Sequence, residues 1–131
     1  MKKEIQKRAD VFLLVTQFYA KVRKDEMLGP IFNNAINDWP EHLERLTDFW
    51  ESNLFFVVKF KGNPIMKHRL VDAQNHHSIE PLHFGIWLRL WFTTIDTYFY
   101  GEKATLAKNR ARNMSHLLYM KIHESRPKNN A

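Results

Sequence analysis

Hydrophobic side chains recur at intervals of three and four residues along most of this chain, and this spacing limits the folds that it can adopt. Within residues 40–58, one continuous stripe of a helix would carry His42, Leu46, Phe49 and Asn53. The 131 residues include only 4 glycines, which is few for a protein built from strands and tight turns. The pattern therefore predicts an all-α fold with little or no strand.

Prolines mark the expected starts of several helices, because the amide hydrogen that proline lacks has no helical partner in the first turn. The predicted helices cover residues 3–23 (bent or split), a short stretch after Pro30, residues 40–58, a short stretch after Pro64 that contains His68, residues 80–100 and residues 102–124. No repeat, low-complexity segment or linker divides them. We expect one domain over residues 1–131, with frayed ends at 1–7 and 125–131.

Aromatic residues are abundant, at 14% of the chain, and most of them are phenylalanine. With 44% hydrophobic residues, the composition is not that of a disordered protein, and the chain is long enough to bury a core. The aromatic excess must fill either a tightly packed core or a pocket for a large apolar ligand.

The chain contains no cysteine. Disulfides, zinc–thiolate sites, iron–sulfur clusters and thiolate nucleophiles are therefore excluded. Imidazole and carboxylate groups would have to hold any metal ion.

The N-terminal residues lack a cleavable hydrophobic segment, and the longest apolar run, Leu54–Val58, is too short to span a bilayer. We therefore expect a cytoplasmic protein with no membrane partner. The formal net charge is +6, but lysines and arginines are scattered at helical spacing. This scatter favours a solvated surface over a nucleic-acid interface.

Two histidines stand out by their positions. His42 begins a helical run, and His68 follows a short loop. A flat, metal-containing cofactor held between two helices needs such an arrangement, with one imidazole ligating the metal and another facing its open side. From the residues alone, both could equally be surface histidines.

Six short motifs, taken in order, resemble the truncated hemoglobins. They are Phe18–Arg23, Leu28–Phe32, Pro40–Leu43, Asp48–Trp50, Pro64–His68 and His83–Leu90. The first two groups of that family typically carry paired glycines near helix junctions, and this chain has no Gly-Gly pair, so the resemblance is to the third group. It implies a two-over-two helical sandwich around haem b (iron protoporphyrin IX).

The resemblance also implies roles for individual residues. His68 would be the proximal iron ligand, for which a neutral imidazole is suited. His42 would face the ligand side or swing out to gate it, and Tyr19 and Trp87 would donate hydrogen bonds to a ligand on the iron. Read without the family, Tyr19 and Trp87 could be ordinary core aromatics. We assign Trp91, one turn after Trp87, to packing.

Further cofactor contacts follow from the same resemblance. Phe32 would stack on the porphyrin, and Leu46, Phe49 and Trp50 would wall the distal side. Arg45 could reach a haem propionate as a charge-assisted pair. Plain core residues would give the same pattern, and Arg45 could equally be a solvated surface residue.

These assignments imply a protein that binds dioxygen and other diatomic ligands at a penta-coordinate iron. Donors from Tyr19 and Trp87 would hold dioxygen tightly and release it slowly, which suits redox chemistry better than oxygen delivery. Nitric oxide dioxygenase and peroxidase-like activity are both open, and for a peroxidase His42 would be the distal base. Turnover would need an external reductase.

Two other functions stay open at this point. One is a non-haem helical binding module whose aromatic core merely resembles a globin. The other is a haem-based gas sensor that passes the ligand state to a partner, although no segment of the sequence suggests an output domain.

Overall fold

The computed structural model describes residues 2–57, 68, 70–73 and 79–126. The helices are α1 (Arg8–Lys24), α2 (Leu28–Ala35), α3 (Trp39–Phe55), α5 (Pro81–Tyr98) and α6 (Glu102–Ser125). Residues 68 and 70–73 are also helical, whereas the predicted helix start at Pro64 and the loop before it lie outside the described residues. The described part of the chain forms no strand beyond one isolated bridge. The predicted all-α fold is confirmed.

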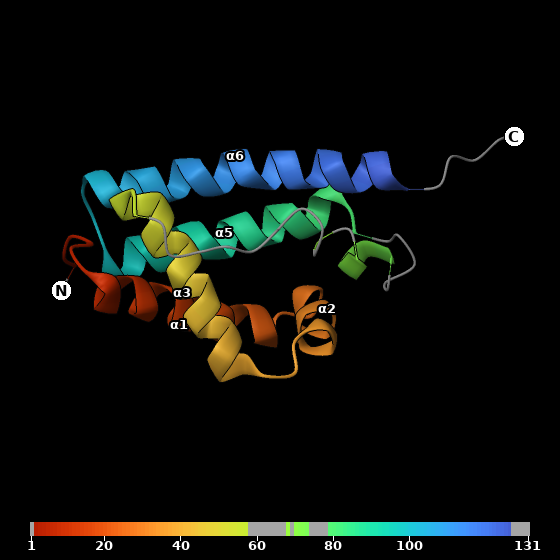
Figure 1. Ribbon diagram of the computed structural model, residues 1–131, viewed down its shortest axis with the longest axis horizontal. Helices are drawn as coiled ribbons and strands as arrows, with labels where there is room; N and C mark the ends of the chain where they lie inside the picture. Colours follow the sequence, from red (N-terminus) through yellow and green to blue (C-terminus); the bar gives the residue numbers. More distant parts are fainter. Residues whose placement is uncertain (1, 58–67, 69, 74–78, 127–131) are drawn as a thin grey trace, which may run out of the picture.

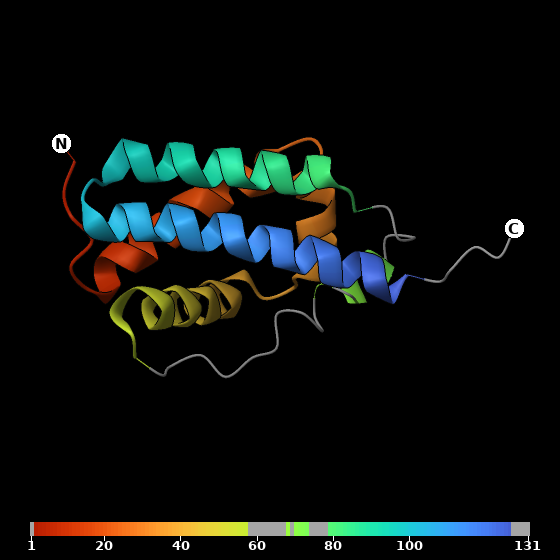
Figure 2. The ribbon, with the colours of Figure 1, turned by 90° about the horizontal axis from the view of Figure 1, so that it is seen from above.

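The helices form two packed pairs. Helix α1 lies against α3, and α5 runs antiparallel beside α6, while α1 also contacts α5 and α3 also contacts α6 (Figure 2). This is the expected two-over-two arrangement. Figure 1 shows α2, the start of α5, the end of α6 and the helical turn 70–73 gathered at one end of the molecule. That end contains the cavity described below.

Local interactions fix where the helices that line this end begin. The Asp38 carboxylate accepts a hydrogen bond from the Glu41 amide (3.2 Å) and so caps α3, with Pro40 in the first turn. At the start of α5, the Glu80 amide donates to Nδ1 of His83 (2.8 Å). These starts agree with the prolines in the sequence to within one residue.

The hydrophobic core lies where the two helix pairs cross. Trp50 of α3 stacks on Trp91 of α5, with ring centroids 4.5 Å apart. The Trp91 indole nitrogen donates to the carbonyl oxygen of Ala107 (3.1 Å), and Ala107 and Ala111 are fully buried, so α6 approaches closely. The assignment of Trp91 to packing is confirmed.

The structure of the N-terminal residues differs from two predictions, that a helix begins at residue 3 and that residues 1–7 are frayed. The first helix begins at Arg8, not at residue 3. The Lys3 amide donates to the Tyr98 carbonyl (3.2 Å), the Tyr100 amide donates to the Lys3 carbonyl (3.0 Å), and Ile5 is 2% exposed. Backbone hydrogen bonds therefore hold the residues before α1 against the end of α5, and these residues are not frayed.

Ion pairs cover the outer surface where α1 crosses α3. The Arg8 guanidinium contacts the carboxylates of Asp48 (2.6 Å), Glu51 (2.7 Å) and Glu44 (2.8 Å). The hydrogen bonds that Arg8 donates to these carboxylates, first of all to Glu51, raise the pKa of Arg8. Among the helices of the described chain, none combines the length and apolar character needed to cross a membrane.

Candidate cofactor-binding site

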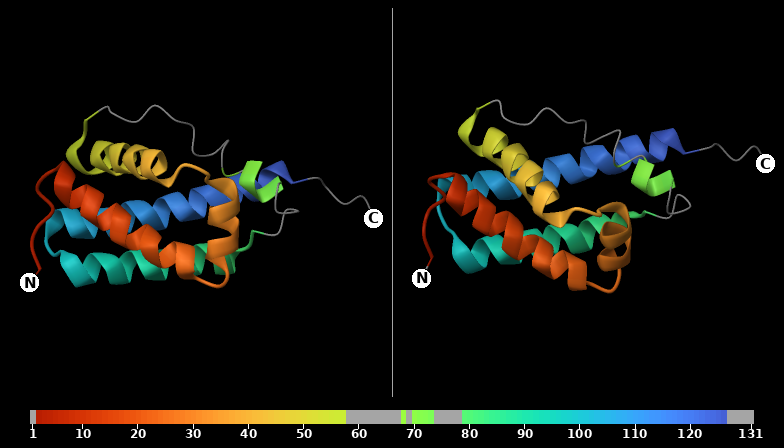
Figure 3. Two further views of the ribbon diagram at one scale, coloured as in Figure 1. Left: turned by 90° about the horizontal axis from the view of Figure 1, so that it is seen from below. Right: turned by 60° about the horizontal axis from the view of Figure 1, so that its bottom comes forward.

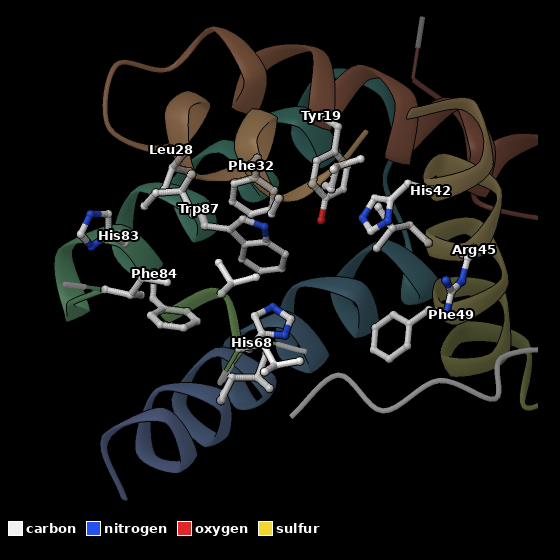
Figure 4. Close-up of a pocket in the computed structure, with 18 of the residues that line it drawn as sticks. Tyr19, Leu28, Phe32, His42, Arg45, Phe49, His68, His83, Phe84 and Trp87 are labelled. Atoms are coloured by element: carbon white, nitrogen blue, oxygen red, sulfur yellow. The ribbon is translucent and has the colours of Figure 1, made fainter. Parts of the chain in front are cut away.

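A cavity of about 510 Å³ opens between α2, α3, α5, α6 and the turn that carries His68 (Figure 4). Its volume lies in the range of small-molecule and cofactor sites, about 300–1,000 Å³. Most of its wall is apolar, with contributions from every surrounding element, among them Leu28, Phe32, Phe49, Val71, Phe84 and Leu118.

Both histidines singled out in the sequence line this cavity. Figure 4 shows the His68 ring on one side and the His42 ring on the other, near Tyr19. Both side chains are half-buried. Trp39 meets the His42 ring edge-on, with centroids 5.8 Å apart, and the Arg23 guanidinium covers Trp39 at 4.5 Å. In this arrangement His42 faces the cavity and is packed there by Trp39.

Tyr19 and Trp87 meet on the same side of the cavity as His42 (Figure 4). Tyr19 is only 5% exposed. Phe18 makes edge contacts with both rings, at 4.7 Å to Tyr19 and 5.2 Å to Trp87, which holds the two aromatics in place. Burial raises the pKa of Tyr19, and a hydrogen bond from the Trp87 side chain lowers it by a smaller amount.

The hydrogen bond between these two residues has a defined direction. An indole N–H can only donate, so in a hydrogen bond between the two side chains the Tyr19 oxygen is the acceptor. Because the raised pKa keeps the phenol protonated at neutral pH, Tyr19 retains its own O–H for another acceptor. Tyr19 is therefore a buried donor that a ligand in the cavity could use.

Four of the five residues predicted to contact a cofactor also line the cavity: Phe32, Arg45, Leu46 and Phe49. The Phe32 ring lies 5.8 Å from that of Tyr19. Arg45 is exposed to solvent while lining the cavity, which places its guanidinium where a charged group at the opening could be paired.

Trp50 is the fifth, and the structure does not bring it to the cavity. It is 1% exposed and stacks on Trp91 in the core. Successive residues of a helix point about 100° apart, so Phe49 and Trp50 face different sides of α3. The expectation that Trp50 walls the distal side is corrected: it is a core residue.

The contribution of α6 to the cavity wall was not predicted from the sequence. Four residues of α6 line it: Ser115, Leu118 and Ile122, spaced by three and four residues on one helical face, and Met114, one turn before Leu118. Leu117, next to Leu118 in the sequence, is 46% exposed and does not line the cavity. The regular spacing is a signal for a buried face but does not say whether a helix or a ligand covers it.

This set of residues fits a flat, largely apolar group that carries a metal ion. Aromatic and aliphatic side chains offer two broad apolar walls, and His68 presents one imidazole from below. One axial imidazole is enough for haem iron, because the porphyrin supplies the in-plane ligands. Tyr19 and His42 supply polar groups on the opposite side.

Comparison with known proteins agrees with this geometry. No protein-family model matches the chain. A group 3 truncated hemoglobin from Campylobacter jejuni subsp. jejuni serotype O:2 is 33% identical over 116 residues, which cover 86% of this chain and 87% of that protein.

The fold agrees as well. The crystal structure of a group III truncated hemoglobin from Campylobacter jejuni is similar, with a TM-score of 0.80 and 30% sequence identity. The similarity covers 98% of this chain and 100% of that one. The chain belongs to the third group of the truncated hemoglobins.

Proposed function

We propose that this protein holds haem b with His68 as the proximal ligand of a penta-coordinate iron, and that it binds dioxygen and other diatomic ligands on the opposite face. Membership of the truncated hemoglobins implies a haem cofactor. The observation that most supports the detailed proposal is the convergence of Tyr19, Trp87 and His42 on the side of the cavity away from His68.

When bound, haem supplies the iron and the redox chemistry, while the protein supplies position and electrostatics. Phe32, Leu46 and Phe49 bind the apolar faces and exclude water. Arg45 pairs with a propionate at the opening. His68 would be the residue that binds the iron.

On the distal side, the donor pair is organised before any ligand arrives. Trp87 fixes the Tyr19 oxygen, and the Tyr19 O–H is left to donate to a ligand that carries partial negative charge. Because the Tyr19 hydroxyl is already oriented, little reorganisation of the protein is needed when a ligand binds. Dioxygen is therefore held tightly and released slowly. Slow release favours a redox role over oxygen delivery.

The redox role we propose is reaction with nitric oxide or with peroxide. His42 is the group in the distal wall that can accept and return a proton, and its packing on Trp39 keeps the ring near the cavity. Repeated turnover draws electrons from an external reductase.

Absorption spectroscopy of the haem-loaded protein tests the proposal. We expect a Soret band for the wild type, a five-coordinate ferrous spectrum, and loss of stable haem in His68→Ala that added imidazole restores. A protein that gives no Soret band after loading would be a non-haem binding module. Full haem retention by His68→Ala without imidazole would assign the iron to another residue.

A further inference from the structure

The helical turn that carries His68 has little hydrophobic anchoring. Of its described residues, His68 and Val71 are half-buried, and Leu70 and Ala73 are exposed. The most deeply buried residue of the turn is a carboxylic acid, Asp72, which is 0% exposed. A polar interaction therefore anchors this turn to the rest of the protein.

That interaction reaches Asp72 from the far end of the chain. Arg126, the C-cap residue directly after α6, donates from Nε to Asp72 Oδ2 (3.1 Å) and from Nη2 to Asp72 Oδ1 (3.0 Å). A bidentate pair of this kind fixes orientation as well as distance. Figure 3 shows the turn lying beside the end of α6.

The same guanidinium also joins the turn to the segment before α5. Arg126 Nη2 donates to the carbonyl oxygen of Ile79, and the Ile79 amide donates to Asp72 Oδ1 (3.1 Å). One arginine thus links three parts of the chain: the His68 turn, the approach to α5 and the end of α6. Hydrogen bonding to Asp72 raises the pKa of Arg126.

This linkage lies next to the cavity wall on the His68 side. Asp72 follows His68 by one helical turn and so shares its face of the helix. Val71 and Ile79, its neighbours in the linkage, line the cavity, and so does Ile122, one turn before Arg126. A shift of Asp72 relative to α6 would therefore move His68 relative to the cavity.

We propose that the Asp72–Arg126 ion pair positions the proximal imidazole by docking the His68 turn against the end of α6. This inference rests on the proposed function, since it takes His68 to be the iron ligand. Neither residue touches the cofactor: both are positioning residues. A buried carboxylate that loses its cation is strongly unfavourable, so without Arg126 the turn moves toward water and takes His68 with it.

The test measures haem loss from the loaded protein by transfer to excess apomyoglobin. We expect Arg126→Met to lose haem about 10- to 100-fold faster than the wild type, the range found when groups behind a metal ligand are removed. Arg126→Lys should fall between them, because lysine keeps the charge but not the bidentate geometry. Arg110→Met, an exposed position on α6, is the matched control and should behave as the wild type does.

Two further readouts separate positioning from general destabilisation. The iron–histidine stretching band of the ferrous protein should shift or broaden in Arg126→Met, and the amides of residues 70–73 should exchange faster while those of α1 and α3 do not. The double variant Asp72→Asn/Arg126→Met should lose haem more slowly than Arg126→Met, because it also removes the buried negative charge that the Arg126 guanidinium balances.

The negative results distinguish the positioning role of the Asp72–Arg126 pair from the assignment of His68 as the iron ligand. An unchanged rate of haem loss in Arg126→Met, or a lowered melting temperature with an unshifted iron–histidine band, would overturn the positioning role. Haem retention by His68→Ala would instead overturn the proposed ligand, whatever the Arg126 variants do.

Discussion

Tyr19 and Trp87 lie together in the cavity wall, where Phe18 packs edge-on against both rings, with centroids 4.7 Å and 5.2 Å away (Figure 4). In a hydrogen bond between their polar groups the indole N–H is the donor and the phenol oxygen the acceptor, which leaves the phenol O–H for another acceptor. We therefore propose that Tyr19 contacts a ligand directly and that Trp87 acts through Tyr19.

Tyr19→Phe should accelerate dioxygen dissociation by about 10- to 100-fold, since a hydrogen bond to a charged acceptor is worth about 1.5–3 kcal/mol. Stopped-flow measurement of the dissociation rate provides the check. Tyr98→Phe is the matched control, because the Tyr98 hydroxyl contacts Gln17 (3.4 Å) and Tyr98 is not among the cavity-lining residues. An unchanged rate in Tyr19→Phe would remove the phenol from the site.

Trp87→Phe should also accelerate dissociation, but by less than Tyr19→Phe, because the phenol keeps its proton and loses only its orientation. The double variant should release dioxygen at nearly the rate of Tyr19→Phe alone, since Trp87 acts through Tyr19. The same stopped-flow assay applies. Fully additive effects on the logarithm of the rate would mean that each side chain contacts the ligand independently.

Alkaline pH should destabilise the protein partly through Tyr19. Burial raises the pKa of Tyr19 above the ordinary phenol value of 10.0 despite the hydrogen bond from Trp87. Above that pH the unfolded chain loses the Tyr19 proton first and the folded protein keeps it, so the free energy of unfolding falls as the pH rises. Below that pH, the contribution of Tyr19 to the free energy of unfolding does not change with pH.

Urea unfolding of the wild type and of Tyr19→Phe at a series of pH values measures the contribution of Tyr19 to the pH dependence of stability. The difference in unfolding free energy between the two proteins should be constant up to about pH 10 and then shrink. A difference that stays constant at higher pH would mean that the folded protein does not protect the phenol.

Most of the residues that the sequence singled out for the site line the cavity, and one of them does not. Tyr19, Trp87, His42 and Phe49 lie where the periodicity and the family motifs place them. Trp50 was misplaced because adjacent residues of an amphipathic helix can both be apolar, and only the packing of α3 on Trp91 decides which one faces the core.

Two other misses have a tertiary cause. The helix predicted over residues 3–23 begins only at Arg8, because Lys3 pairs with Tyr98 and Tyr100 through backbone hydrogen bonds, and that pairing depends on where α5 ends. The link between Asp72 and Arg126 spans 54 positions and leaves no local signal in the sequence.

Glycine replacements should affect stability in opposite directions at two helical sites. Gly85 lies in α5, where an added Cβ would meet no atom within 4 Å, so Gly85→Ala should raise the free energy of unfolding by about 1 kcal/mol. At Gly29 a Cβ would lie 2.7 Å from the Arg23 carbonyl oxygen, so Gly29→Ala must push α2 away from α1 and should destabilise the protein. Denaturant unfolding of both variants checks the pair, and stabilisation by Gly29→Ala would contradict this packing of α2.

His42 provides the sharpest way to separate the two redox roles. If the protein consumes peroxide, His42→Leu should lower that rate by about 100-fold or more, since the variant lacks the distal proton acceptor. Reaction of the dioxygen-loaded protein with nitric oxide requires no such base, so its rate should change little.

His83→Leu is the matched control for this experiment. His83 also lines the cavity, but its Nδ1 already accepts a hydrogen bond from the Glu80 amide at the start of α5. We expect wild-type rates in both assays for this variant. Equal loss of peroxide turnover in His42→Leu and His83→Leu would show that neither imidazole acts as a specific base, and nitric oxide chemistry would then be the better supported role.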